Sequence, residues 1–168
     1  INYAYQNNVL CVISAGNYEP SRSGSTQYID APATYSSYAR PFYGRSYWPN
    51  VIAVGATNFD DNLTAYSKHV PRPISQSKVT VVAPGGEGSN QIYSTTPTYS
   101  SYRWPDQTGW NYGSGTSAAA PYVAGVAALI WSVAPGLTAG EVRTIIEQTA
   151  NQVGNYEYGP NFSSGMGH

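Results

Sequence analysis

The sequence is poor in the residues that most often carry metal chemistry or hold small domains together. Its 168 residues include one cysteine, Cys11, and two histidines, His69 and His168. A single cysteine excludes an internal disulfide, and no cluster of Cys and His is available for a zinc site. A chain of this length, 41% hydrophobic, is therefore expected to form one globular domain around a hydrophobic core.

Charged residues are also scarce. They make up 10% of the chain, and 8 basic and 9 acidic side chains leave a formal net charge of −1. This balance gives no basic face for nucleic acid and no acidic tail, so no nucleic acid is expected as a partner. Sixteen tyrosines and loops rich in Ser, Gly and Asn are common in secreted proteins. We therefore expect a secreted or extracytoplasmic location.

No apolar run is long enough to suggest a membrane span. The most apolar stretch, from Ala118 to Ala134, is shorter than the ~20 residues that a span needs. Pro121, near its start, suits the first turn of a helix. Small residues on most sides of this helix indicate close packing inside a protein. The stretch therefore predicts a buried core helix and no membrane span.

Three short runs rich in β-branched residues predict buried strands. They extend from Val9 to Ile13, from Val51 to Ala56 and from Val79 to Pro84. Continuous apolar runs of this kind are typical of parallel sheets that are covered on both faces. The predicted fold class is α/β, layered, with a mainly parallel sheet.

The remaining segments predict a second helix and two long loops. Thr138 followed by Glu141 is a capping-box pattern that predicts a final helix, ending near Asn151. The segments Ser21 to Pro49 and Gly85 to Gly109 are rich in Tyr, Ser, Pro and Gly. They are predicted to be surface loops of the same domain.

Two short motifs have the residue types for chemistry. "SGTSAAAP" places Ser117 at the first turn of its helix, where unpaired N–H groups and the helix dipole favour a developing negative charge. The alternative is that Thr116 or Ser117 is simply an N-cap. "VISAGN" places the Asn17 amide after a strand, at the edge where open α/β sheets usually bind ligands. The alternative there is a turn asparagine.

Together and in this order, these segments resemble the subtilisin-like serine proteases. The nucleophile motif of that family is matched by "GTSAAAPYVAG", from Gly115 to Gly125, and its oxyanion asparagine by "SAGN". "APATY", "NVIAVGAT" and "VVAPG" resemble segments that lie between these two, and "GMGH" resembles the turn before the closing helix of the family. The resemblance implies a three-layer subtilisin-like fold. It also implies that residues 1–168 are the C-terminal portion of a single peptidase catalytic domain.

The implied activity is that of a serine endopeptidase acting on proteins or peptides through an acyl-enzyme on Ser117. The oxyanion would be held by the Ser117 N–H and the Asn17 side chain. The resemblance also implies a primary specificity pocket with one wall from the end of the first strand and a base from a later segment. These wall and base residues are Ser14, Ala15, Gly16, Pro32, Ala33 and Thr34.

The chain departs from the family pattern at two catalytic positions. The catalytic Asp and His of the family precede the Asn17 segment, and this chain contains neither. His69 falls in a loop remote from the site, and Tyr122 occupies a packing position where the family often has histidine. We therefore expect the upstream part of the same domain to be a partner, and the isolated chain to be inactive.

The implied chemistry requires no cofactor. Structural calcium is frequent in the family, but no dense carboxylate loop supports it here, and Asp60 and Asp61 are predicted to lie in a solvated turn. Two other functions stay open. One is a catalytically inactive subtilase-like binding or scaffolding domain. The other is a sedolisin-type acid peptidase, a family with an aspartate where this chain has Asn17.

Overall fold

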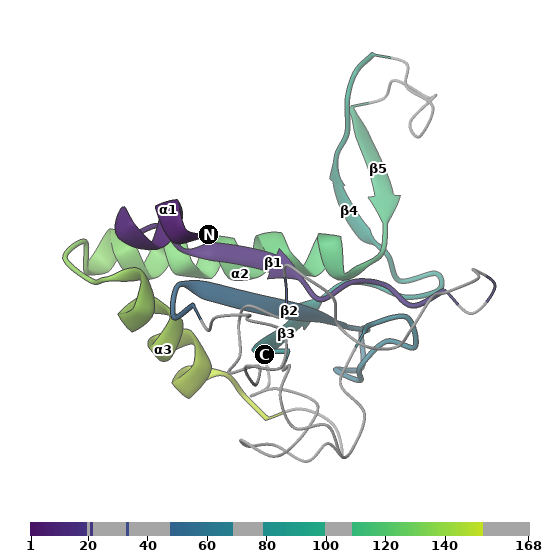
Figure 1. Cartoon of the computed structure of the whole chain (residues 1–168). Coiled ribbons are helices and arrows are strands. Elements are labelled where there is room, and N and C mark those ends of the chain that lie inside the picture. The colour runs from purple at the N-terminus through teal and green to yellow at the C-terminus, as the bar shows by residue number, and fades with distance from the viewer. Residues whose placement is uncertain (20, 22–32, 34–47, 69–78, 100–108, 153–168) are drawn as a thin grey trace.

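A computed structural model describes residues 1–19, 21, 33, 48–68, 79–99 and 109–152 (Figure 1). The described part contains three helices and five strands. In chain order these are α1 (Asn2–Gln6), β1 (Cys11–Ser14), β2 (Val51–Thr57), β3 (Val81–Pro84), β4 (Ile92–Thr95), β5 (Trp110–Gly113), α2 (Thr116–Val133) and α3 (Ala139–Thr149).

The centre of the structure is a parallel sheet of three strands in the order β1-β2-β3 (Figure 1). Its register pairs Val12 with Ile52 and Val54 with Val81. Every residue of β2 is buried, because this strand has a neighbour on both sides. The three predicted strands and the parallel sheet are confirmed, although β1 and β3 begin later than their apolar runs do.

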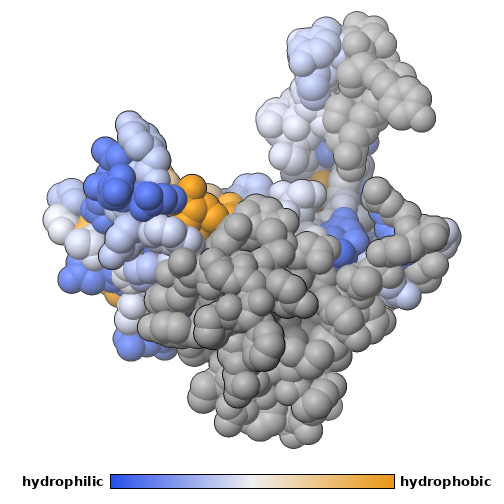
Figure 2. Space-filling view, in the orientation of Figure 1, coloured by the Kyte–Doolittle hydropathy of each residue, from blue (hydrophilic) through white to orange (hydrophobic). Residues whose placement is uncertain are grey.

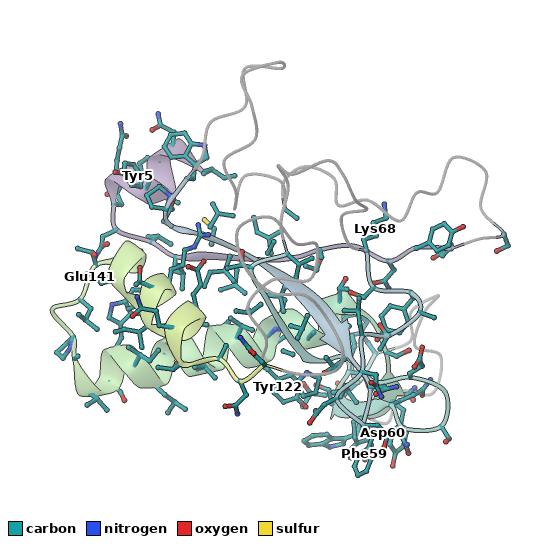
Figure 3. All side chains as sticks on the ribbon, turned by 90° about the horizontal axis from the view of Figure 1, so that it is seen from below. Tyr5, Phe59, Asp60, Lys68, Tyr122 and Glu141 are labelled. Carbon is teal, nitrogen blue, oxygen red and sulfur yellow. The ribbon has the colours of Figure 1, made fainter. Side chains whose placement is uncertain are left out.

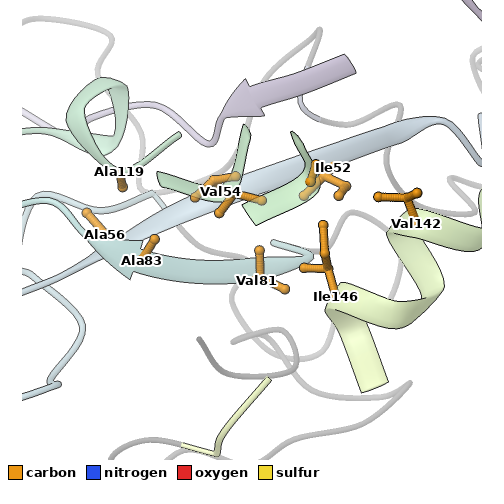
Figure 4. Packing of buried hydrophobic residues seen from close by; sticks show 10 residues of the cluster. Ile52, Val54, Ala56, Val81, Ala83, Ala119, Val142 and Ile146 are labelled. Atoms are coloured by element: carbon orange, nitrogen blue, oxygen red, sulfur yellow. The ribbon is translucent and has the colours of Figure 1, made fainter. Parts of the chain in front are cut away.

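The main core lies between one face of this sheet and two helices, α2 and α3 (Figure 4). Successive residues of a strand face opposite sides, so alternate residues of β2 point into this cluster. Its buried members are Ile52, Val54, Ala56, Val81, Ala83, Ala119, Val123, Ala127, Val142 and Ile146. A second cluster of Ala15, Ala33, Ala53, Val79 and Val82 lies apart from it. The α/β class is confirmed, and α2 and α3 contribute to the same cluster.

Helix α2 begins at Thr116 without a side-chain cap. Gly115 is its N-cap residue and has no side chain that could accept a hydrogen bond from the first turn. The interpretation of Thr116 or Ser117 as a simple N-cap is therefore wrong. Pro121 is the sixth residue of the helix, beyond the first turn predicted for it. Its missing N–H therefore removes one hydrogen bond of the helix.

One face of α2 packs on β1, β2 and β3, and the other is exposed. Val126, Leu129 and Val133 are 46%, 68% and 86% exposed. The expectation of close neighbours on most sides is therefore wrong for the described part of the chain. By length and composition alone, α2 could cross a membrane, but core helices of soluble proteins meet the same criterion. On the face shown in Figure 2, an orange area lies where β1 and α2 meet in Figure 1.

Helix α3 begins with the predicted capping box. The Thr138 Oγ1 accepts a hydrogen bond from the Glu141 N–H, and the Glu141 carboxylate accepts one from the Thr138 N–H. These bonds to Thr138 lower the pKa of the Glu141 carboxyl below its usual value. The helix ends at Thr149, close to the predicted end.

A projecting hairpin was not predicted. β4 and β5 form an antiparallel pair that extends away from the sheet (Figure 1). Tyr93 stacks on Trp110 with ring centroids 5.6 Å apart and packs on Tyr112 at 4.7 Å, as cross-strand aromatic pairs do. The prediction that Gly85 to Gly109 is only a surface loop is wrong, because β4 lies inside it.

Candidate active site

The C-terminal end of β1 lies against the N-terminus of α2. The backbone N–H of Gly16, just after the strand, donates to the Thr116 Oγ1 over 3.1 Å. This bond joins residues 100 positions apart in the sequence. The sheet therefore brings together the two motifs that the sequence suggested for chemistry.

The Asn17 side chain is fixed by the first residue of α2. Its Oδ1 accepts hydrogen bonds from the Thr116 N–H, at 3.0 Å, and from the Thr116 hydroxyl, at 2.8 Å. Because a backbone N–H needs an acceptor, these bonds fix which end of the amide is the oxygen. Asn17 is therefore more than a turn asparagine, since its side chain binds across to the helix.

Gly115 lies between Asn17 and Ser117, where there is no room for a side chain. An ideal Cβ on Gly115 would lie 2.9 Å from the Asn17 Nδ2 and 3.3 Å from the Ser117 Oγ. Gly115 also has a φ of +147°, a conformation that side chains rarely allow. Glycine at this position therefore keeps a side chain out of the space between the amide and the hydroxyl.

Two hydrogen-bond donors border this space. The Ser117 N–H and the Asn17 Nδ2 both have no acceptor within the described ranges. The next N–H groups of the helix, those of Ala118 and Ala119, donate to the Gly115 carbonyl at 2.9 and 3.2 Å. Free donors at a helix N-terminus can stabilise a negative charge that develops beside them.

Ser117 also lines a cavity between α2 and the hairpin. The cavity has a volume of about 650 Å³, and its wall includes Ser94 and Asn111 from the hairpin and Tyr122 from α2. Tyr122 is 47% exposed, so the described contacts do not bear out its predicted role in packing. Figure 3 labels Tyr122 on α2, and Phe59 and Asp60 on an exposed turn.

The residues implied for the specificity pocket are only partly described. Ser14 ends β1, and Gly16 follows with a φ of +101°. Ala15 and Ala33 are both 2% exposed and belong to one buried cluster. Pro32 and Thr34 lie outside the described residues, as do both histidines, His69 and His168.

The predicted solvated turn is confirmed. Asp60 and Asp61 are exposed, and the Asn58 Oδ1 shapes the turn by accepting hydrogen bonds from the N–H groups of Asp60 and Asn62. No group of three His, Cys, Asp or Glu side chains that could hold a metal ion occurs in the described part of the chain.

Sequence comparison connects this geometry to a family. A model of the subtilase family matches residues 1–167. The chain belongs to the subtilase family. Subtilisin DY of Bacillus licheniformis is 34% identical over 160 residues, which cover 94% of this chain and 45% of that protein. Thermitase of Thermoactinomyces vulgaris is 36% identical over 155 residues, covering 91% of this chain and 40% of thermitase.

Structure comparison gives the same result for the fold. Sphericase superposes with a TM-score of 0.66 and 26% sequence identity over 99% of this chain and 49% of its own. The subtilisin-like α/β fold is therefore confirmed. The chain spans about half the length of the relatives that it matches.

Within this subtilase chain, sequence reasoning missed the part played by Thr116. Its side chain contacts Gly16 and Asn17 instead of capping α2. A local pattern cannot reveal these contacts, because Ser and Thr before an apolar helix are ordinary capping residues. Only the assembled sheet places Thr116 beside the end of β1.

Proposed function

We propose that residues 1–168 are the C-terminal portion of a serine endopeptidase catalytic domain, with Ser117 as its nucleophile. The observation that carries this proposal is a pair of donors on either side of Gly115, the Ser117 N–H and the Asn17 Nδ2, neither of which has an acceptor among the described residues. Membership of the subtilase family supports a serine protease. The upstream part of the same domain would supply the catalytic histidine and aspartate.

In the proposed reaction, the Ser117 Oγ attacks the carbonyl carbon of a peptide bond while a histidine of the upstream part takes its proton. The carbonyl oxygen becomes negatively charged and accepts hydrogen bonds from the Ser117 N–H and the Asn17 Nδ2. The histidine then protonates the leaving amine, and the acyl group remains on Ser117. Water activated by the same histidine hydrolyses this ester and restores the serine. These steps use no cofactor.

The proposed substrates are proteins and peptides. Ser14, Ala15 and Gly16 would form one wall of the primary specificity pocket, and Pro32, Ala33 and Thr34 its base. Small residues in such a wall leave room for a large substrate side chain. A degradative peptidase of this kind fits a secreted or extracytoplasmic location, which we also propose.

The proposed upstream part would also cover apolar surface. The outer face of α2 exposes Val126, Leu129 and Val133, and contiguous apolar surface of this kind usually marks an interface. The relatives are about twice as long as the matched region, so each has enough additional chain to form such a cover.

The test of the nucleophile uses the protein with its upstream part and a fluorophosphonate probe. Ser117→Ala should abolish both labelling and peptide hydrolysis, because the probe needs the activated hydroxyl. The matched control is Ser132→Ala, which removes an exposed serine of the same helix and should be labelled and active like the wild type.

Labelling of Ser114 or Ser94 in place of Ser117 would contradict the assignment. A wild-type protein that binds peptides, takes up no probe and hydrolyses nothing would instead support the inactive binding or scaffolding alternative. Activity confined to acidic pH would support the acid peptidase alternative.

A further inference from the structure

Tyr66 lies beside the Asn17 segment and reaches the turn at Gly85 and Gly86. Its backbone carbonyl accepts a hydrogen bond from the Tyr18 N–H at 2.7 Å, next to Asn17. Its hydroxyl points the other way and donates to the Gly86 carbonyl at 2.6 Å. One half-buried residue therefore contacts both the Asn17 segment and the turn at Gly85 and Gly86.

That turn is in direct contact with Gly115, two residues before Ser117. The Gly115 N–H donates to the Gly85 carbonyl at 2.9 Å. An ideal Cβ on Gly85 would lie 2.9 Å from both the Gly115 carbonyl oxygen and the Tyr66 hydroxyl, and 2.4 Å from the Ala56 Cβ. Gly85, Gly115 and the Tyr66 hydroxyl are therefore packed without space for another atom.

The next residue of the turn is fixed as well. The Glu87 carboxylate accepts hydrogen bonds from the Ala65 N–H at 3.0 Å and from the Asn58 Nδ2 at 3.2 Å. Ala65 is the chain neighbour of Tyr66, so the same segment holds Gly86 through a side chain and Glu87 through its backbone. A displacement of Ala65 and Tyr66 would therefore move the turn whose Gly85 carbonyl binds the Gly115 N–H.

We propose that Tyr66 is a positioning residue that sets the location of Ser117 relative to the Asn17 amide, through its hydroxyl bond to Gly86 and the contact of Gly85 with Gly115. This inference rests on the proposed function of Ser117. Burial raises the pKa of the Tyr66 hydroxyl above its ordinary value, so the group keeps its proton and stays a donor at neutral and mildly alkaline pH.

The test is Tyr66→Phe in the protein with its upstream part. Phenylalanine keeps the ring and removes only the hydroxyl, so the turn at Gly86 should loosen while the fold persists. We expect kcat to fall by about tenfold, the order of one lost hydrogen bond, with KM changed by less than about twofold, because a small displacement of reacting groups acts on turnover. Fluorophosphonate labelling of Ser117 should slow by a similar factor.

Two controls separate positioning from stability. Tyr3→Phe removes a hydroxyl from a tyrosine of α1 that is 79% exposed, and it should leave kcat unchanged. Thr138→Ala lowers the melting temperature through the cap of α3, remote from the turn, and should also leave kcat unchanged well below that temperature. Glu87→Gln weakens the hydrogen bonds that the Glu87 carboxylate accepts from Ala65 and Asn58. It should also lower kcat.

The failures of the two proposals are distinguishable. If Ser117→Ala is still labelled, the proposed nucleophile is wrong. If Ser117 is labelled in the wild type but Tyr66→Phe and Glu87→Gln react at the wild-type rate, the nucleophile stands and the positioning role of Tyr66 is overturned. A fall in kcat that Thr138→Ala reproduces at equal loss of melting temperature would overturn the positioning role as well.

Discussion

Only the oxygen of the Asn17 amide has partners among the described residues, and this makes a sharp substitution available. Asn17→Asp keeps an oxygen for the N–H and hydroxyl of Thr116 but replaces the Nδ2 donor by an oxygen that repels an oxyanion. We expect kcat to fall about 10²–10³-fold, the loss found for such a donor in the relative subtilisin. KM and the melting temperature should change little. Steady-state kinetics and thermal unfolding test this, and near-normal turnover would show that the amide is only structural.

At the scale of single residues, Ser117 and Asn17 were selected as candidates from the sequence, because each lies in a motif of a few residues. The hydrogen bonds that position them could not be predicted in this way. The bonds from Thr116 to Asn17 join residues 99 positions apart, and the contribution of Tyr66 depends on a turn 20 positions further along the chain. Such contacts arise from the packing of the sheet, so no local pattern predicts them.

At the scale of elements, the cap of α3 gives a prediction that is independent of catalysis. Thr138→Ala should lower the free energy of unfolding by about 1 kcal/mol, because it removes the acceptor for the Glu141 N–H. Thr144→Ala is the matched control, since Thr144 lies inside the same helix and its hydroxyl donates to the Gly140 carbonyl within that helix. Urea unfolding of both variants measures the difference, and equal stability of the two would contradict the role of the cap.

The same cap predicts a dependence on pH. The pKa of Glu141 is lower in the folded state than its ordinary value of 4.5, so the ionised carboxylate favours folding. This contribution is present above the unfolded pKa and is lost as the pH falls through the lowered folded pKa. Thr138→Ala keeps the backbone bond to the carboxylate, which is the larger cause of the lowered pKa, and loses the bond between the two side chains. Acidification should therefore destabilise the wild type somewhat more than Thr138→Ala. Urea unfolding at neutral and acidic pH checks this, and an equal loss in both proteins would count against it.

The elements that could be predicted are those whose burial fixes their pattern. β2 is apolar throughout because it is buried along its whole length, and α3 carries its start signal in its own sequence. The β4–β5 hairpin was missed because its strands have four residues each and are mostly exposed. The extent of packing around α2 was overestimated, because small apolar residues do not reveal how many neighbours a helix has.

At the scale of the whole molecule, the isolated chain is predicted to be a poor peptidase. Ser117 alone is too weakly acidic to ionise at neutral pH, and proton transfer needs a base within ~2.6–3.2 Å. Oxyanion donors without the rest of a triad leave at most about 10³–10⁴-fold catalysis over water. Peptide hydrolysis and fluorophosphonate labelling should be compared for residues 1–168 with and without the upstream part. Robust activity of the isolated chain would refute the need for a partner and make His69 the base to examine.

The long separation of Asn17 and Thr116 also has a consequence for biosynthesis. Their contact closes a loop of about a hundred residues through a parallel sheet, and contacts of this range form slowly because chain entropy opposes them. The serine is present as soon as it is synthesised, but the donor pair beside it exists only after the sheet has assembled. Under the proposed function, a nascent chain therefore cannot stabilise an oxyanion. Other unfolded chains nearby are protected from hydrolysis by this chain until it has folded.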